Sequence, residues 1–330
     1  MSYDDNVRRM ARAEELGDLL VRDDEIDFGR YQATPADRAK VRPAASWCDQ
    51  VIDHFSAPAE LQGAFLPWRR VQNEIRLRPG ELSIWTGING HGKSLILSQI
   101  MLCLARQGEK VCIASLEMKP VATMARMARQ ALGTLEPGPL ETREFHQMLR
   151  GQLWLYDQQG TVRPSRMFGV MRYCREELGI GHLVIDSLMK CGLAEDDYNG
   201  QKDFVDVLST YAKDSGLHVH LVAHSKKLDD ERTAPGKFDV KGSGTITDMA
   251  DNVFATWRNK AKETAMARDD KSAEEVRHHP DAMLRCDKQR NGDWEGSLKL
   301  WFVKHALQYV AKNSQQTIDY MRWTPGGFEE

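Results

Sequence analysis

The segment Gly87 to Ser94 constrains the fold of this chain more than any other part of its sequence. It reads Gly-Ile-Asn-Gly-His-Gly-Lys-Ser, an unbroken match to G-x-x-x-x-G-K-[ST], between an apolar run, Leu82 to Thr86, and a helix-like stretch, Leu95 to Arg106. A strand, a glycine-rich turn and a helix in this order form a loop whose backbone N–H groups point at phosphate oxygens. An ordinary glycine-rich turn is the alternative, and the flanking strand and helix disfavour it. The sequence therefore predicts a phosphate-binding loop.

The loop also predicts a set of cofactors. Lys93 is expected to reach the β- and γ-phosphates of ATP or another NTP, and Ser94 is expected to ligate Mg²⁺. The residues expected to contact the nucleotide are Gly87, Asn89, Gly90, His91, Gly92, Lys93, Ser94 and Leu95.

Composition limits the architecture and the partners without identifying them. The 330 residues, 41% hydrophobic and 28% charged, suffice for one principal domain with appendages. With a formal net charge of -3, contact with nucleic acid must come from local basic loops. The six cysteines form no C-x-x-C pair and no zinc-like spacing to histidine, so we expect buried thiols in a reducing cytosol. The charged start and the lack of a long apolar run predict a cytoplasmic protein with no membrane partner.

Residues 1–64 are predicted to be an arm and linker, with the principal domain at 65–330. Residues 1 to 45 carry ten acidic and eight basic residues and few large apolar ones, too few for an independent core. From Trp47 to Leu66 the apolar spacing allows a short helix that packs on a neighbour. The composition of the arm fits a disordered tail.

From Glu81 onward, short apolar runs of strand length alternate with helix-like segments. This alternation predicts an α/β fold in which a mostly parallel sheet is covered by helices on both faces. The strand candidates are Leu82 to Thr86, Val111 to Leu116, Leu153 to Tyr156, Leu183 to Ile185 and Val219 to Ala223. The helix candidates are 95 to 106, 121 to 132, 165 to 178 and 201 to 214.

After about residue 250 the pattern becomes rich in strands. The highly charged stretch Asn259 to Pro280 is expected to be an exposed helix or a mobile insertion. The strand candidates in this part are Val253 to Trp257, Ala282 to Cys286, Leu298 to Val303 and Leu307 to Val310.

Two carboxylates follow predicted strands and are candidates for catalysis. Asp186 ends the run His182 to Asp186, where it would lie beside Ser94 and help to hold Mg²⁺. The alternative for Asp186 is a carboxylate that caps a helix after a buried strand. Glu117 follows the second strand and would orient the water that attacks the γ-phosphate, or accept its proton. The alternative for Glu117 is an exposed residue before a helix.

A histidine and two cations complete the candidates. His224 follows Leu221 to Ala223 and is a candidate sensor of the γ-phosphate, with a structural histidine as the alternative. Lys288 and Arg290 would project from one face if their strand continues. Two such cations could reach a nucleotide, and they would be supplied by another subunit if subunits form a ring. A solvated strand edge is the alternative for this pair.

Several further segments occur in a recognisable order. They are Gly80-Glu81-Leu82, Ser115 to Met118, Leu183 to Asp186, Leu221 to Ser225, Gly242 to Ile246 with Ala250-Asp251, and Lys288 to Gly292 before Gly296 and Leu298 to Phe302. In their order and spacing, the chain resembles the RecA-like motor domain of DnaB-type hexameric replicative helicases, especially the branch of phage primase-helicases and mitochondrial Twinkle. The resemblance implies a RecA-like P-loop NTPase with a central, mostly parallel sheet flanked by helices and a strand-rich C-terminal part.

The resemblance also assigns roles to individual residues. It implies that Glu117 is the catalytic carboxylate, that His224 senses the γ-phosphate, and that Lys288 and Arg290 act on the nucleotide of a neighbouring subunit. More weakly, Arg258 resembles a residue near the nucleotide base.

A second channel loop of the family, which grips single-stranded DNA, corresponds to Lys226 through Gly244. Its basic residues are offset by Asp229, Asp230, Glu231 and Asp239, so backbone contacts require the acids to face outward. The DNA-binding candidates in this loop are Lys226, Lys227, Lys237, Lys241, Gly242, Ser243 and Gly244.

The leading interpretation is a ring helicase, expected to be a hexamer, that translocates on single-stranded DNA in replication. Its 5′ to 3′ polarity is implied by the resemblance alone. No segment before residue 65 resembles a primase, so a primase or loader would be a separate protein. The resemblance to ring helicases makes the N-terminal arm a candidate for docking between subunits, and a disordered tail fits its sequence equally well. The alternative is a RecA- or KaiC-like ATPase that binds DNA or acts in recombination without unwinding. A weaker option is an accessory ATPase that loads or regulates another helicase.

Overall fold

The computed structural model describes residues 43–56, 63–226, 235–241, 244–268, 271–314 and 316–323. The chain divides into two units, Met1–Pro58 and Ala59–Glu330. In the first unit, η1 (Ala44–Trp47) leads into α4 (Cys48–Ser56), which agrees with the short helix predicted from the apolar spacing. The large apolar side chains of this helix, Val51, Ile52 and Phe55, are exposed.

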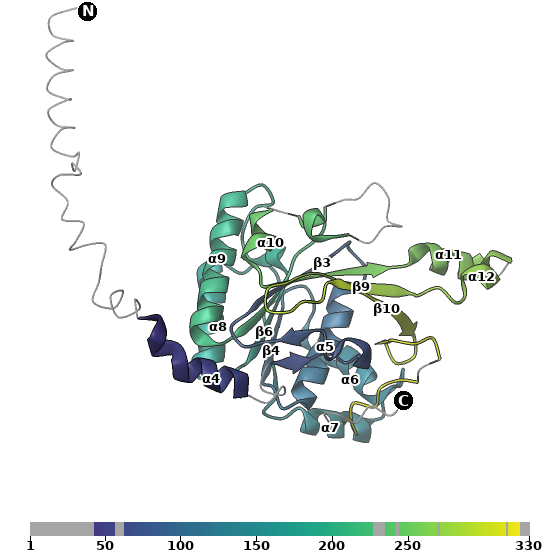
Figure 1. The fold of residues 1–330 in the computed structure, drawn as a ribbon. Helices are drawn as coiled ribbons and strands as arrows, with labels where there is room; N and C mark the ends of the chain where they lie inside the picture. Colours follow the sequence, from purple (N-terminus) through teal and green to yellow (C-terminus); the bar gives the residue numbers. More distant parts are fainter. Residues whose placement is uncertain are drawn as a thin grey trace, which may run out of the picture. The chain divides into compact units, whose positions relative to one another are not determined.

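The second unit is built on a nine-stranded sheet with the order β11-β10-β9-β8-β3-β7-β6-β4-β5 (Figure 1). From β8 to β5 neighbouring strands run parallel, whereas β9, β10 and β11 are antiparallel to their neighbours. The parallel strands are β3 (Leu82–Gly87), β4 (Val111–Ser115), β5 (Leu153–Leu155), β6 (His182–Asp186), β7 (His218–Val222) and β8 (Asn252–Arg258). The antiparallel strands are β9 (Ala282–Gln289), β10 (Gly296–Val303) and β11 (Gln308–Val310).

Helices cover both faces of this sheet. One face packs under α5 (Lys93–Arg106), α6 (Pro120–Leu132) and α7 (Pro139–Met148), in a core that includes Trp85, Ile100 and Phe145. The other face packs under α8 (Pro164–Glu176), α9 (Tyr198–Ser215) and α10 (Thr245–Met249), in a core that includes Ile84 and Leu208. The α/β fold with a mostly parallel sheet is therefore confirmed.

The strand-rich C-terminal part also agrees with the prediction. The charged stretch forms α11 (Lys260–Arg268) and α12 (Lys271–Val276), which Figure 1 shows beyond one end of β8 and β9. Three features have no counterpart in the sequence prediction: α7, α10, and a small antiparallel pair of β1 (Ala64–Phe65) and β2 (Arg76–Leu77) with η3 (Arg69–Val71) between its strands. Two further 3-10 turns are η4 (Leu188–Lys190) and η5 (Lys237–Asp239).

Parallel pairing brings the carboxyl ends of the central strands to one edge of the sheet. Ser115 at the end of β4 is the register partner of Asp186 at the end of β6, and β3 and β7 end beside them. Ligand sites in open α/β sheets lie outside this edge. The phosphate loop, Glu117, Asp186 and His224 all follow strands that end there.

Candidate nucleotide-binding site

The phosphate loop connects β3 to α5, as the sequence predicts. Gly87, Gly90 and Gly92 have φ angles of 152°, 78° and 85°, in the left-handed half of the map that favours glycine. Gly92, which precedes α5, provides no side-chain cap, so the backbone N–H groups of Lys93 and Ser94 at the start of this helix can face an anion. Lys93 lies across this loop, because its Nζ donates to the carbonyl oxygens of Gly87 at 2.7 Å and Ile88 at 3.1 Å.

Ser94 and Asp186 meet as predicted. The Ser94 hydroxyl donates to Asp186 Oδ2 at 2.5 Å, which places a hydroxyl and a carboxylate side by side at the start of α5. Among the described residues, no group of three or more His, Cys, Asp or Glu side chains is arranged to hold a metal. Mg²⁺ bound together with nucleotide phosphates needs only one or two protein oxygens, so this pair fits such an ion.

Burial governs the electrostatics of these groups. It lowers the pKa of Lys93 to about 8, although the carboxylates of Asp186 and Glu117 oppose this shift. It raises the pKa of Asp186, against the hydrogen bond from Ser94. Both charged forms are therefore costly in this desolvated site, and a ligand of opposite charge would stabilise each of them.

Glu117 and His224 converge on a serine that the sequence analysis did not single out. The Ser187 hydroxyl donates to Glu117 Oε1 at 3.3 Å and lies 3.5 Å from His224 Nε2. Glu117 is exposed, as a group that contacts water must be. Burial, followed by the nearby charge of Lys93, lowers the pKa of His224, and its Nδ1 is buried without a hydrogen-bond partner among the described residues. Ser187 directly follows the predicted metal carboxylate, and this position is the signal that could have identified it.

A second residue missed by sequence reasoning is Arg126 on α6. Arg126 and Thr123 line a small cavity together with Ser94, Ser115 and Asp186. Within the described residues, Arg126 Nε and Thr123 Oγ1 are buried without a hydrogen-bond partner. Burial lowers the pKa of Arg126, and the charge of Asp186 opposes this shift. Arg126 lies in the middle of a helix with no motif around it, so no sequence signal marked it.

The cation pair, Lys288 and Arg290, lies at the opposite edge of the sheet. Lys288 pairs with Val253 in β8, and Arg290 N donates to Asp251 O at 2.8 Å. Asp251 N in turn donates to Leu82 O at the start of β3, five residues before Gly87, which corresponds to about 16 Å along a strand. The pair therefore does not reach the phosphate loop of its own chain.

The two cations nevertheless converge, as predicted. Lys288 Nζ donates to the carbonyl oxygens of Thr247 at 3.0 Å and Asp248 at 2.9 Å, and Arg290 Nη2 donates to that of Asp248 at 3.1 Å. The Arg290 side chain remains 43% exposed. The role of the pair at the nucleotide of another subunit stays a prediction, with a solvated edge as its alternative.

Arg258 lies beside the phosphate loop at the end of β8. Its backbone N–H donates to His91 Nδ1 at 3.2 Å, its Nη1 donates to Gly90 O at 3.4 Å, and its guanidinium pairs with Glu263 on α11. The side chain of His91 is fully buried.

The expected DNA-binding loop is described in part. Lys227, Gly242 and Ser243 lie outside the described residues. Lys241 pairs with Glu195 at 2.6 Å, Lys226 Nζ donates to Phe238 O at 3.4 Å, and Lys237 Nζ lies 5.4 Å from the centre of the Phe238 ring. Phe238 itself is 83% exposed. Gly244 precedes the first residue of α10.

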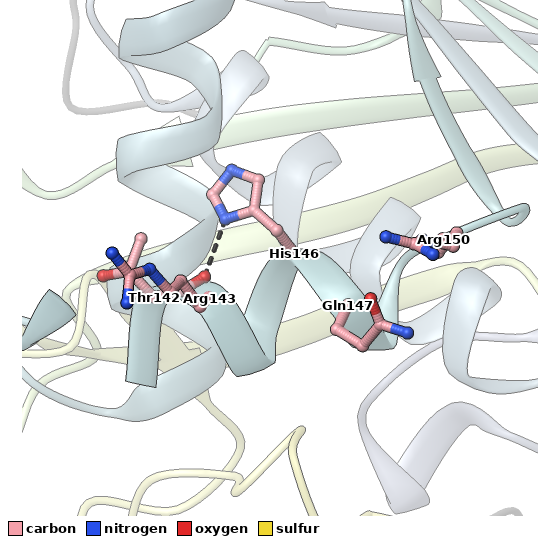
Figure 2. A pocket seen from close by; sticks show the side chains of 5 residues that line it. All are labelled: Thr142, Arg143, His146, Gln147 and Arg150. Atoms are coloured by element: carbon pink, nitrogen blue, oxygen red, sulfur yellow. Dashed lines mark hydrogen bonds between the residues drawn. The ribbon is translucent and has the colours of Figure 1, made fainter. Parts of the chain in front are cut away.

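A separate hollow lies on the surface of α7. Thr142, Arg143, His146, Gln147 and Arg150 line it, and Figure 2 shows the hydrogen bond from His146 Nδ1 to Thr142 O along the helix. No sequence-predicted site residue lines this hollow. Separately, no helix among the described residues is long and apolar enough to span a bilayer.

Comparisons with known proteins agree with this geometry. The model of the AAA domain family matches residues 56–230, which is more than half of the chain. The chain is 27% identical over 207 residues to the DNA helicase/primase of Enterobacteria phage T3 and 25% identical over 226 residues to the Twinkle homolog protein, chloroplastic/mitochondrial, of Arabidopsis thaliana. These alignments include 56% and 60% of this chain but only 36% and 31% of the two relatives.

Solved structures show the same fold at low identity. A DnaB-like replicative helicase, studied with its interactions with primase, superimposes with a TM-score of 0.67 and 14% identity over 83% of this chain and 69% of its own. A second solved structure, that of an ATPase domain, superimposes with a TM-score of 0.68 and 15% identity over 82% of this chain and 99% of its own. Membership of an ATPase domain family, together with the geometry of the loop, indicates nucleotide binding. The chain therefore belongs to the AAA domain family, and its fold is the RecA-like motor fold of DnaB-type replicative helicases.

Proposed function

We propose that this chain is the motor of a ring helicase that hydrolyses NTP at a seam between two copies and translocates on single-stranded DNA in replication. One observation carries the proposal: the phosphate loop and the cation pair lie at opposite edges of the same sheet. If one copy places the carboxyl ends of its parallel strands against Lys288 and Arg290 of the next copy, the two copies together form a site that neither contains alone.

Within the seam, one copy would hold the nucleotide and its neighbour would stabilise the transition state. Lys93 would move from its loop carbonyls to the β- and γ-phosphates, and Ser94 and Asp186 would hold Mg²⁺. Bound between Ser94 and Asp186, Mg²⁺ would supply positive charge against the phosphate oxygens. Glu117, held by Ser187, would orient the attacking water and accept its proton. Lys288 and Arg290 of the neighbour would stabilise the charge that develops on the phosphoryl group.

His224 offers a route from the γ-phosphate to DNA. Its ring faces Ser187 at the active site, and its carbonyl oxygen accepts from Lys241 N at 2.7 Å. Lys226 N donates to Asp239 O at 2.6 Å, and Ser225 forms a bridge with Val240. Residues 239–241, near the end of the expected DNA-binding loop, are therefore bonded to the segment that carries His224. Movement of this histidine on loss of the γ-phosphate would shift the loop and its lysines.

The assembly we propose is a homohexameric ring with 5′ to 3′ polarity. A replicative helicase among the structural neighbours was studied with primase, and a phage relative is a helicase/primase, which supports a primase or loader as a further partner. The exposed apolar side chains of α4 support a role for the N-terminal arm in docking between subunits. The cytoplasm is the compartment that suits these partners.

The rate of NTP hydrolysis with and without single-stranded DNA tests the proposal. Acceleration by DNA and displacement of a strand from a forked duplex are the expected results. Hydrolysis that ignores DNA would contradict a translocase. DNA-stimulated hydrolysis without strand displacement, with open filaments in electron micrographs, would favour the RecA- or KaiC-like alternative.

A further inference from the structure

Asp251 makes contacts with both the strand of the phosphate loop and the cation pair. It follows α10 and is 3% exposed. Its backbone N–H donates to Leu82 O at 2.8 Å, and its Oδ2 accepts from Leu82 N at 2.9 Å. Its carbonyl oxygen accepts from Arg290 N at 2.8 Å, and its Oδ1 lies 3.4 Å from Arg290 Nη1. Opposite sides of one buried residue thus hold β3 and Arg290.

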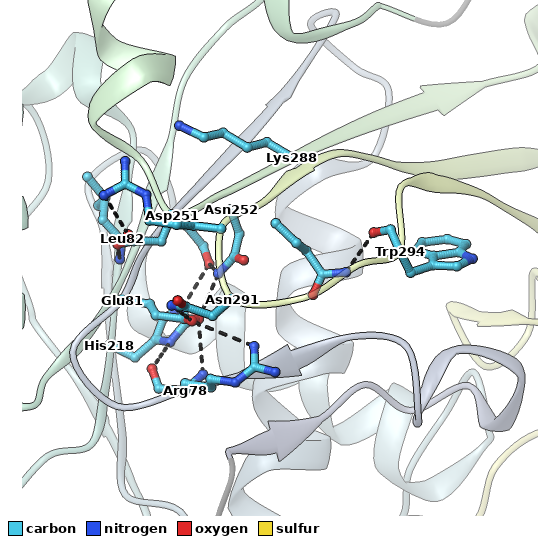
Figure 3. A network of polar contacts seen from close by, with 12 residues as sticks. Arg78, Glu81, Leu82, His218, Asp251, Asn252, Lys288, Asn291 and Trp294 are labelled. Atoms are coloured by element: carbon cyan, nitrogen blue, oxygen red, sulfur yellow. Dashed lines mark hydrogen bonds and ion pairs between the residues drawn. The ribbon is translucent and has the colours of Figure 1, made fainter. Parts of the chain in front are cut away.

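A second contact connects the segment that carries the cation pair to the start of β3. Glu81, the residue before β3, accepts from Asn291 Nδ2 at 2.8 Å through Oε1 and from Asn252 Nδ2 at 2.9 Å through Oε2. Figure 3 shows Glu81, Asn252 and Asn291 gathered beside Asp251. Asp251 and Glu81, next to the start of β3, therefore hold the backbone of Arg290 and the side chains of Arg290 and Asn291. These contacts add to those of Lys288 and Arg290 with the carbonyl oxygens of α10.

We propose that Asp251 is a positioning residue, which holds Arg290 in register with the phosphate-loop strand of its own chain so that the guanidinium is presented to the nucleotide of the next copy. Arg290 has a long, flexible side chain that is 43% exposed, and ordering it in advance lowers the entropic cost of reaching the transition state. The proposal rests on the shared seam of the proposed function. In each copy, Asp251 would also connect β3, the strand that leads into the phosphate loop, to the Arg290 that this copy supplies to its neighbour.

The contacts of Asp251 allow a selective substitution. In Asp251→Asn the side chain keeps one oxygen. This oxygen is expected to stay on the buried N–H of Leu82, because a buried donor left without a partner destabilises the fold. The amide NH₂ then faces Arg290 and cannot accept from it. Asp293→Asn is the matched control, because Asp293 is exposed and makes none of the contacts described above.

We expect Asp251→Asn to lower kcat for NTP by about 10- to 100-fold, the range for a catalytic group displaced by about 1 Å, with nucleotide affinity unchanged. Asp293→Asn should match the wild-type protein. Loss of nucleotide affinity equal to the loss of rate would mean that Asp251 acts on its own phosphate loop, which would overturn the proposal. A wild-type kcat in Asp251→Asn would overturn it as well.

Mixing subunits separates positioning from a structural role. Lys93→Ala subunits lack a working phosphate loop but carry an intact cation pair, whereas Asp251→Asn subunits carry a working phosphate loop and a misplaced cation pair. In an equal mixture, about a quarter of the seams would join a working phosphate loop to an intact cation pair. We expect hydrolysis above that of either variant alone. No gain, in conditions where Arg290→Ala mixed with Lys93→Ala does gain, would overturn the role of Asp251 and leave the seam intact.

If Arg290→Ala with Lys93→Ala also gives no gain while the wild-type protein is active, the seam itself is contradicted and the role of Asp251 falls with it. If Asp251→Asn unfolds at a lower temperature than the wild-type protein, Asn291→Ala is a second test. This change removes the tether to Glu81 without leaving a buried backbone group unpaired. It should reduce kcat by a smaller factor and should be rescued by the same Lys93→Ala subunits, and failure of that rescue would overturn the positioning role.

Discussion

Three buried histidines at the start of β6 and β7 predict that the protein loses stability in mild acid. His182, His218 and His220 stack with ring centres 4.3 to 5.4 Å apart, and none is more than 3% exposed. Burial lowers the pKa of all three, and the charge of a neighbouring histidine lowers further the pKa of His182 and His220. The stack lies against Ser83 and Trp85 of the phosphate-loop strand.

The hydrogen bonds assign one neutral tautomer to each ring. His218 Nδ1 donates to Arg78 O at 2.6 Å, so its Nε2 accepts from the Ser83 hydroxyl at 2.8 Å. Trp85 Nε1 donates to His220 Nδ1 at 3.2 Å, so His220 Nε2 donates to His182 Nδ1 at 3.1 Å. A proton added to Nδ1 of His220 or of His182 would break one of these bonds, because the partner in each case is an N–H donor that cannot accept.

The sign of the pH dependence follows from the lowered pKa values. The unfolded chain takes up protons on histidine below about pH 6.5, while the folded chain does not, so the free energy of unfolding falls as the pH drops. At pH 5.5, each imidazole that is neutral in the folded state and protonated in the unfolded chain lowers the free energy of unfolding by roughly 1 to 2 kcal/mol. For His182 and His220 together, the loss is about 3 kcal/mol. Burial raises the pKa of Glu109, which lies 3.7 Å from His182 and offsets part of this loss. The net loss is a large fraction of the stability of a typical domain.

Urea unfolding at pH 7.5 and 5.5, at constant ionic strength, measures this effect. His220→Gln should reduce the difference in unfolding free energy between the two pH values by roughly 1 kcal/mol or more. His146→Gln, which changes an exposed histidine on α7, is the control and should leave it unchanged. The same pH dependence in His220→Gln as in the wild-type protein would refute the reasoning.

Four further predictions concern the nucleotide site. Lys93→Ala removes the cation from the loop and should abolish turnover; calorimetric titration should show weakened nucleotide binding, and wild-type affinity would argue against a phosphate contact. Glu117→Gln should bind nucleotide normally and lose about 10²- to 10⁴-fold in kcat, and normal single-turnover hydrolysis would remove this residue from the mechanism. Ser94→Ala should raise the Mg²⁺ concentration needed for half-maximal hydrolysis, and chelation should stop the wild-type reaction; an unchanged Mg²⁺ titration would exclude the hydroxyl as a ligand. His224→Asn should hydrolyse NTP with a reduced response to single-stranded DNA, and full stimulation by DNA would contradict the coupling route.

Much of the fold could be predicted because its elements carry strong local signals. Buried parallel strands read as continuous apolar runs, and α6 begins at Pro120 and is followed by Gly133 with φ 66°, as the helix signals indicate. The short elements α10 and β1 have no such periodicity. Their formation depends on packing against segments distant in sequence, which a single sequence does not display.

The residues of the site also differ in whether a local sequence signal marks them. Residues at strand ends, such as Asp186 and Glu117, could be predicted because topology brings the carboxyl ends of parallel strands together. Arg126 reaches the site from a helix, and Asp251 acts through contacts with residues more than 35 positions away, so neither follows from a local motif. The expected DNA-binding loop, Lys226 to Gly244, is described in part, and its role in binding DNA stays a prediction.

Specific activity as a function of protein concentration, measured together with the mass of the assembly, tests the shared seam most directly. If two copies build each site, NTP hydrolysis per subunit should be negligible for the monomer and should rise in parallel with the oligomer. An isolated monomer that hydrolyses NTP at the full rate, at concentrations where no oligomer forms, would contradict this account.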